Sequence, residues 1–221
     1  MKMKALAGLL SIPALALAGT LAHAAIVYDN GGPNASSGNE TTQWVQAENF
    51  AIAGGASLTG AGVYIGSTNG GGFPTGWDGT MDYFFFADAG GSPGGLLASG
   101  AGQNVTTTPG FPWCCGGTSS LIDFDLAAAF AAAAGTTYWF GIHLSTNFDR
   151  DELYWVTTSG GALPRGHESN GGTFNNWSNN GQEHAFFLEA NGAIPEPISL
   201  FLIAIGLAGL GLASIRRRKY R

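Results

Sequence analysis

The chain has 221 residues and a formal net charge of −6, and only 11% of its residues are charged. The net value conceals an uneven distribution, because seven of the nine lysines and arginines lie within the first four or the last six residues. The central part, residues 25–193, holds two arginines against fourteen acids, a net charge of −12. A domain of that charge is repelled by nucleic acid and by anionic membrane or polysaccharide surfaces unless divalent cations intervene, so we expect no nucleic-acid partner.

The first 24 residues have the layout of a secretory signal peptide. Lys2 and Lys4 form a basic start, and an apolar stretch follows. Ala22 and Ala24 then place small residues at the two positions that signal peptidase reads. We therefore expect signal peptidase to cleave after Ala24 and the remaining chain to be exported. The alternative is an uncleaved N-terminal anchor.

The central region, residues 25–193, is the size of one domain and has the pattern of an all-β sandwich. Short segments rich in aromatic and β-branched residues alternate with turns that collect many of the 36 glycines. The predicted strands are 25–28, 44–52, 56–65, 81–87, 121–125, 137–144, 153–158 and 185–188. The aromatic runs 83–86 and 138–140 are continuous rather than alternating, which indicates central strands covered on both faces.

Two local patterns interrupt the strands. The alanine-rich run 127–134 is the one helical-looking stretch, and we interpret it as a turn or short helix that ends at Gly135, or as a low-complexity connector. Pro93 followed by Gly94 predicts a type II turn, because proline fixes φ at the first central position and glycine accepts the positive φ that follows.

Aromatic side chains lie in several glycine- and asparagine-rich loops, with Trp77, Trp113 and Trp177 as the tryptophans among them. Sugars stack their apolar faces on such rings while asparagine and aspartate bind the hydroxyl groups. The three tryptophans are therefore candidate glycan contacts. The alternative is that the rings fold back and plug the ends of the sandwich.

Cys114 and Cys115 are adjacent in a loop of an exported chain. Neighbouring cysteines cannot join distant strands, and a bond between them closes a strained eight-membered ring. A vicinal disulfide is one hypothesis, and free thiols or intermolecular pairing are the others. Metal binding by the pair is not expected, since no second pair completes four ligands.

The densest acidic segment spans residues 147–152, where Asp149, Asp151 and Glu152 offer carboxylate oxygens. Ca²⁺ takes six to eight oxygen ligands, and a loop of this kind can supply about three or four of them. The segment is a candidate structural Ca²⁺ site, and a solvated acidic loop is the alternative. We expect no other cofactor.

Catalytic motifs are not found in the chain. His143, His167 and His184 lack metalloprotease spacing and a neighbouring nucleophile motif, so a hydrolase would have to assemble its site from distant positions. Asp123 and Asp125 lie on one face of a strand and could act as a carboxylate pair, or they could form a solvated strand face. We do not expect an enzyme.

The C-terminal segment predicts a membrane anchor. Residues 198–215 are eighteen residues without a charge, and a helix of that length covers roughly 27 Å, close to the hydrocarbon thickness of a bilayer. Basic residues follow at once and keep their end of the chain in the cytoplasm, so the preceding domain faces outward. These basic residues are Arg216, Arg217, Arg218, Lys219 and Arg221.

Pro195, Glu196 and Pro197 stand immediately before this span. A Pro-Glu-Pro triplet, one apolar span and an arginine cluster at the end resemble the PEP-CTERM sorting signal of Gram-negative bacteria, here over residues 194–221. The resemblance implies processing by the membrane protease exosortase, a transient inner-membrane anchor, and delivery to the cell surface or the exopolysaccharide matrix. The alternative is an ordinary single-pass tail anchor.

Two further segments, 87–99 and 134–142, are similar to paired features of a recurrent ectodomain of PEP-CTERM proteins. That resemblance implies a jelly-roll-like β-sandwich without established enzymatic residues. We therefore expect an exported protein with a structural or adhesive role in the extracellular matrix, which can include exopolysaccharide as a partner. The alternatives are a carbohydrate-binding, lectin-like module and an unrecognised secreted hydrolase.

Overall fold

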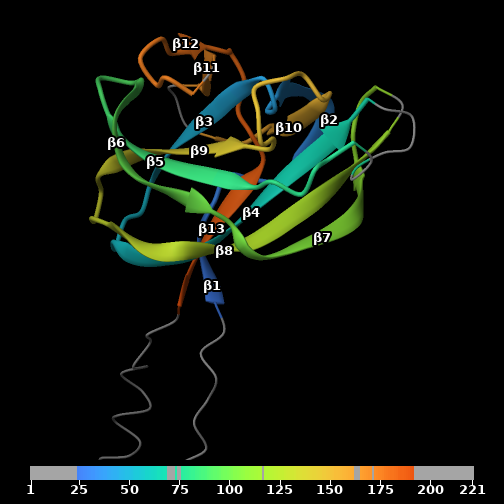
Figure 1. The fold of residues 1–221 in the computed structure, drawn as a ribbon. Coiled ribbons are helices and arrows are strands. Elements are labelled where there is room, and N and C mark those ends of the chain that lie inside the picture. The colour runs from blue at the N-terminus through green and yellow to red at the C-terminus, as the bar shows by residue number, and fades with distance from the viewer. Residues whose placement is uncertain are drawn as a thin grey trace, which may run out of the picture.

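The computed structural model describes residues 24–191, apart from 69–72, 74, 75, 116, 162–164 and 171. This part of the chain consists of strands joined by turns and loops (Figure 1). The strands are β1 (Ala24–Asp29), β2 (Pro33–Glu40), β3 (Trp44–Ala51), β4 (Ala56–Ser67), β5 (Asp82–Asp88), β6 (Pro93–Ala101), β7 (Gln103–Pro112), β8 (Thr118–Ala132), β9 (Thr137–His143), β10 (Leu153–Thr158), β11 (His167–Asn170), β12 (Ser178–Asn179) and β13 (Phe186–Asn191).

The first sheet is organised around β4. Along one edge β4 pairs with β8, which in turn pairs with β7. Along its other edge β4 pairs first with β13 and then with β10, and these two strands carry β1 and β2. Two glycines make β4 a platform, because Gly62 lies under the ring of Phe187 and Gly66 lies under the indole of Trp113, where any Cβ would collide with the ring.

The second sheet has the strand order β12-β11-β3-β9-β5-β6. Its inner face packs on the first sheet through a core of aromatic and branched side chains, in which Phe85 stacks on Phe130 with ring centroids 4.2 Å apart. Its outer face is also covered, because Phe86 and Trp139 pack under a loop that carries Trp177. The prediction that the aromatic runs form central strands covered on both faces is therefore confirmed.

The all-β prediction is confirmed, with every strand pair antiparallel in two sheets. All eight predicted strands are present, seven of them within three residues of their expected bounds, whereas the strand predicted as 121–125 runs on to Ala132. The strands not predicted are β2, β6, β7, β11 and β12. They are rich in glycine, serine, threonine, asparagine or proline, and pairing with a neighbour rather than residue preference makes them strands.

The helical interpretation of 127–134 is wrong. The run continues β8 to Ala132, opposite Ala56 to Leu58 of β4. Phe130 explains the outcome, since its ring is buried against Phe85 across the core. Burial of this one side chain and ladder pairing outweigh the helix preference of the surrounding alanines.

The turn predicted at Pro93–Gly94 lies earlier in the chain. Gly90 and Gly91 form the tip of the β5–β6 hairpin with φ of 73° and 90°, and the N–H of Ala89 donates to the carbonyl of Ser92 at 2.8 Å. Positive φ at both central residues suits the twist of a hairpin, and only glycine adopts it without strain. Pro93 instead begins β6, a position on an edge strand where its missing N–H is tolerated.

The described chain begins and ends at one place, since Ala24 of β1 pairs with Asn191 of β13 (Figure 1). Residues 1–23, with most of the predicted signal peptide, and residues 192–221, with the predicted sorting triplet, span and basic tail, lie outside the described residues. Among the residues described, none forms a helix long and apolar enough to cross a membrane.

Candidate ligand-binding cleft

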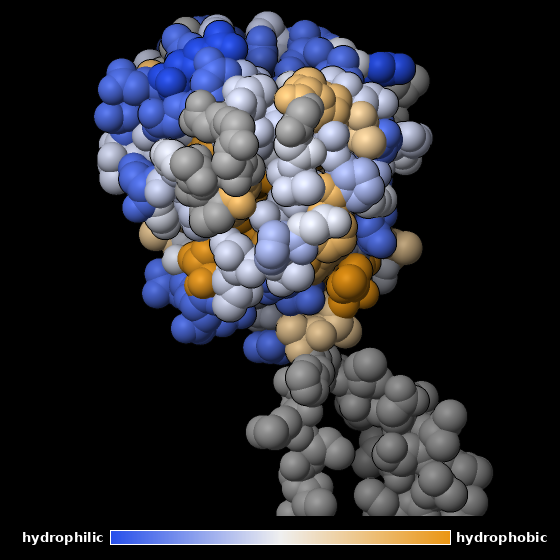
Figure 2. Space-filling view, turned by 90° about the vertical axis from the view of Figure 1, so that its right-hand side faces the viewer, coloured by the Kyte–Doolittle hydropathy of each residue, from blue (hydrophilic) through white to orange (hydrophobic). Residues whose placement is uncertain are grey.

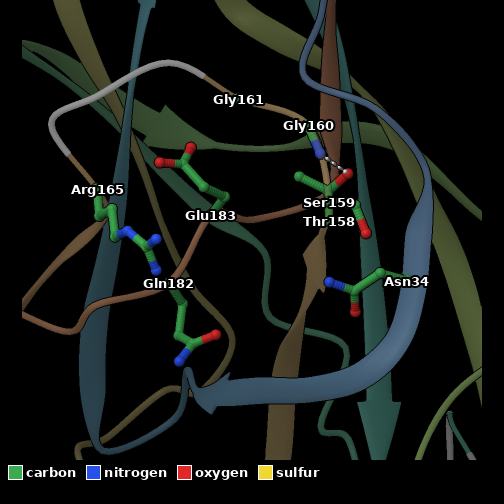
Figure 3. A pocket seen from close by; sticks show the side chains of 8 residues that line it. All are labelled: Asn34, Thr158, Ser159, Gly160, Gly161, Arg165, Gln182 and Glu183. Carbon is green, nitrogen blue, oxygen red and sulfur yellow. Dashed lines mark hydrogen bonds between the residues drawn. The ribbon is translucent and has the colours of Figure 1, made fainter.

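A polar cleft of about 440 Å³ opens where the end of β10 meets β2 and the segments that flank β11 and β13 (Figure 3). Its volume lies within the range of small-molecule and saccharide sites. Most of its lining side chains are hydrogen-bonding groups. The lining residues are Asn34, Thr158, Ser159, Gly160, Gly161, Arg165, Gln182 and Glu183.

Backbone hydrogen bonds hold the walls of the cleft together. The N–H of Thr158 donates to the carbonyl of Glu183 at 2.8 Å, and the N–H of Gly166 donates to the carbonyl of Gln182 at 2.8 Å. Arg165 adds a side-chain bond from Nη1 to the carbonyl of Gly181 at 2.6 Å. Segments far apart in the sequence therefore form one framework, and their side chains are left to line the opening.

The amide side chains of Asn34 and Gln182 line the cleft and lie in the lower part of the view in Figure 3. Oδ1 of Asn34 accepts from the N–H of Ser36 at 2.9 Å and from the hydroxyl of Thr157 at 2.8 Å. With its oxygen occupied, Asn34 presents its amide nitrogen toward the space between the two side chains (Figure 3). Oε1 of Gln182 accepts from the hydroxyl of Ser37 at 3.3 Å, which orients the second amide.

Glu183 supplies the carboxyl group of the cleft. One of its oxygens, Oε2, is buried without a hydrogen-bond partner and lies against Gly161, where a Cβ would collide with it. Burial, together with the charge of Glu48, raises the pKa of Glu183 to about 7, although Arg165 and a hydrogen bond from Asn30 oppose the shift. The group can therefore accept hydrogen bonds as a carboxylate or donate one as an acid near neutral pH.

Behind the cleft lies a buried acid–histidine pair. Glu48 of β3 and His184 are both 0% exposed, and Nδ1 of His184 is 3.0 Å from Oε2 of Glu48. The two oxygens of Glu48 also accept backbone N–H groups, Oε1 from Asn49 and Oε2 from His184, both at 3.1 Å. The other ring nitrogen, Nε2, lies 3.0 Å from Oδ1 of Asn39, and the ring stacks on Trp155.

One proton serves both members of this pair. Burial raises the pKa of Glu48 to about 8, and burial lowers the pKa of His184 to about 3. Both effects favour a pair that is neutral overall, because a net charge in this apolar surrounding would be costly. Both nitrogens of the His184 ring have hydrogen-bond partners and the ring is buried, so the pair does not reach the cleft itself. It acts on the cleft by positioning Glu183, the residue that precedes His184 in the chain.

The three tryptophans predicted as glycan contacts lie in separate places. Trp113 is only 8% exposed, and its ring packs on Tyr154. Trp77 packs on Phe73 and donates from Nε1 to the carbonyl of Thr80 at 2.8 Å. Trp177 packs edge-on against Phe86 outside the second sheet. None of the three lines the cleft, and sugar binding by these rings stays a prediction.

Cys114 and Cys115 form a vicinal disulfide in the loop between β7 and β8. Cys115 has a φ of 68°, an uncommon value for a residue with a side chain. The pair lies next to Trp113, at the end of the domain where that ring covers Gly66.

The acidic segment 147–152 already has partners within the protein. Glu152 pairs with Arg150 at 2.9 Å and accepts from the hydroxyl of Tyr154. Asp151 accepts from the hydroxyl of Ser145 at 3.2 Å. Asp149 belongs to the same loop, yet within the described residues no group of three acid, histidine or cysteine side chains is placed to hold a metal. Binding of Ca²⁺ by this loop stays a prediction.

The remaining titratable candidates do not join the cleft. His143 is buried with Nε2 2.7 Å from the carbonyl of Thr42, and His167 stacks edge-on against Trp139. Asp123 and Asp125 lie on β8, across β4 from Glu189 of β13. Burial raises the pKa of Asp123, and the charge of Asp125 adds to the rise. Of the histidines considered for catalysis, His184 adjoins the cleft residue Glu183 in the chain, and Nδ1 of His167 lies 3.0 Å from the carbonyl of Arg165, but neither ring lines the cleft.

The sequence did not identify the cleft residues. Asn34, Thr158, Gln182 and Glu183 lie in segments of ordinary polar composition and are brought together only by the sheet pairing. One signal was available, namely Glu48, an acid in the middle of a strand whose other members are largely apolar. A buried acid needs a partner, and the structure shows that this partner is His184.

Comparison with known proteins adds one match. The model of the PEP-CTERM protein-sorting motif matches residues 193–219. No curated protein and no solved structure matches the chain. The matched segment covers the Pro-Glu-Pro triplet, the apolar span and most of the basic tail. It implies export and a C-terminal membrane-anchor sorting signal. The chain therefore carries a PEP-CTERM protein-sorting motif, consistent with the sorting domain of an exosortase substrate.

Proposed function

We propose that the domain is an adhesive protein of the extracellular matrix and that its cleft holds neutral polysaccharide. The observation that carries the proposal is the lining of the cleft, which gathers two amides, two hydroxyls, a guanidinium and a carboxyl group. These groups bind the hydroxyl groups of sugars as donors and acceptors. The net charge of −12 on residues 25–193 favours an uncharged polysaccharide over an anionic one.

The sorting motif supports this location. It implies exosortase-dependent sorting of an exported protein, and cleavage near Pro195–Pro197 would release the domain from its anchor. In the proposed order, signal peptidase acts after Ala24, the span 198–215 holds the chain in the inner membrane with the domain in the periplasm, and exosortase then passes the domain to the matrix. A jelly-roll-like arrangement of the two sheets is part of the same proposal.

The alternative is a lectin-like module that recognises one defined glycan through stacked rings. Burial of Trp113 and the packing of Trp77 and Trp177 on neighbouring rings favour the cleft over these tryptophans as the contact. We propose no catalytic step, because the buried His184 and Glu48 occupy each other and face away from solvent. A screen of the purified chain against hydrolase substrates tests that point.

The test compares two glutamates that are both half-buried. Glu183→Ala removes the carboxyl group of the cleft, whereas Glu189→Ala removes one on β13, outside it. We expect the first variant to bind exopolysaccharide isolated from the producing cells about 10-fold more weakly, the loss for one hydrogen bond to a charged group, and the second to bind like the parent. Alginate is the anionic control polysaccharide. Equal binding by both variants would refute the role of the cleft.

A further inference from the structure

Strand β6 is an open edge of the second sheet. It pairs with β5 along one side, and no other described strand pairs with it. An edge strand leaves every second N–H and C=O group without a partner in the sheet, so it can accept a further strand. At its middle Leu96 and Leu97 are 46% and 51% exposed, two of the most exposed large apolar side chains of the described chain.

The other edges carry the features that normally prevent strand addition. β7 contains Pro109 in its interior and ends at a second proline, Pro112. β1 and β2 end in Asp29 and Glu40, and β12 has only two residues. Charges and prolines both discourage the approach of another strand, and so does a strand of very short length. β6 has two register shifts against β5, but it has no charge, and its one proline, Pro93, is its first residue.

The electrostatics of the domain also single out this region. Residues 89–122, which include all of β6 and β7, form a run of 34 residues without a charged side chain or a histidine. Figure 2 shows the β7 side, whose middle is pale, neither strongly hydrophilic nor strongly hydrophobic. Because residues 25–193 carry a net charge of −12, two copies repel each other across most orientations. An uncharged edge is where they can approach closely.

The charged residues nearest to β6 are already engaged. Asp88, opposite Pro93, accepts from the indole Nε1 of Trp139 at 2.9 Å and from the N–H groups of the hairpin tip. Asp82, opposite Ala101, is partly buried, and the charge of His143 partly offsets the pKa rise that burial causes. Neither carboxylate lies opposite the middle of the strand, where a partner strand would pair.

We propose that β6 is a self-association surface, at which a second copy of this chain adds its own β6 in antiparallel pairing. The contact joins the second sheets of the two copies into one continuous sheet and covers Leu96 and Leu97 of both. An edge-to-edge contact of this size is weak in dilute solution and gains strength where export concentrates the protein. It involves no residue of the cleft, so it stands or falls independently of polysaccharide binding.

The test measures association of the purified full chain by sedimentation over a range of concentrations. Leu97→Lys places like charges opposite each other across the contact, and Ala131→Lys adds the same charge at an exposed alanine of β8, outside the uncharged run. We expect the parent and Ala131→Lys to associate equally and Leu97→Lys to associate at least 10-fold more weakly. Any association through the C-terminal segment is common to all three chains and cancels.

Hydrogen exchange on the parent chain provides a test without substitution. We expect the amides of β6 to become more protected as the protein concentration rises, while those of β7 do not change. A parent chain that stays monomeric, equal association of the three chains, or concentration-independent exchange at β6 would each overturn the proposal.

Discussion

The pair formed by Glu48 and His184 makes the stability of the domain depend on pH in a defined way. The folded-state pKa of Glu48, about 8, lies above its ordinary value of 4.5, so the stability from its proton is complete below pH 4.5 and is lost as pH rises through 8. The folded-state pKa of His184, about 3, lies below 6.5, so its contribution is complete above pH 6.5 and is lost as pH falls toward 3. Between pH 4.5 and 6.5 the two changes cancel.

Above pH 6.5 only the change at Glu48 remains within the pair. One pKa unit corresponds to about 1.4 kcal/mol, and the interval from pH 6.5 to 8 spans about one and a half units, so titration of Glu48 should remove about 2 kcal/mol of unfolding free energy there. Glu183, whose pKa burial raises to about 7, adds a smaller loss in the same interval. Glu48→Gln removes the titration of Glu48. It also leaves one oxygen for two buried backbone N–H groups, those of Asn49 and His184, which costs about 1–3 kcal/mol.

The variant Glu48→Gln should therefore be less stable than the parent at pH 6 and nearly equal to it at pH 8. As the pH is lowered, the unfolding free energy of the variant should begin to fall near pH 6.5, because His184 titrates without the opposing change at Glu48. Denaturant unfolding at a series of pH values measures this, and the six tryptophans, all between residues 44 and 177, report on this domain even in the full chain. Parallel pH profiles for parent and variant would refute the shared-proton account.

Four further predictions concern other parts of the chain. Gly66→Ala should displace the ring of Trp113 and lower the unfolding free energy by about 1–3 kcal/mol; an unchanged midpoint in urea would contradict this packing. Trp177→Ala should cost up to about 3–5 kcal/mol without loss of polysaccharide binding, whereas lost binding at an unchanged melting temperature would assign the ring to the sugar. Replacing residues 195–197 by alanine should leave a full-length, membrane-bound species on an immunoblot, and normal maturation would contradict the role of the triplet. Millimolar Ca²⁺ should raise the melting temperature more than Na⁺ at equal ionic strength if loop 149–152 binds it; equal shifts would indicate screening alone.

The sequence predicted the strands whose own residues favour a sheet. Local composition is enough to predict the aromatic runs in β5 and β9 and the apolar stretches of β3 and β10 as strands. Their side chains favour a buried strand whatever the order of the strands in the sheet. β6 and β7 could not be recognised, since their glycines, threonines and prolines are mostly exposed and resemble a loop. Their strand form comes from pairing with β5 and β8, which local composition does not contain.

The cleft was hidden from sequence for a related reason. Asn34 and Glu183 are 149 positions apart, and they meet because β10 pairs with β2 and bridges to His184. Local motifs report chemistry within one segment, such as the sorting triplet, which the comparison with known proteins supports. Chemistry assembled from turns at the end of a sandwich depends on strand order, and strand order was not predicted.

The most direct test of the central claim follows the protein after export. Cells producing the parent, Glu183→Ala or Glu189→Ala would be separated into membrane, matrix and medium, and the processed domain measured in each fraction. We expect all three chains to be processed equally and only Glu183→Ala to move from the matrix to the medium, by about 10-fold in its partition. Retention of Glu183→Ala in the matrix at the parent level would contradict the proposal that the cleft holds the domain there.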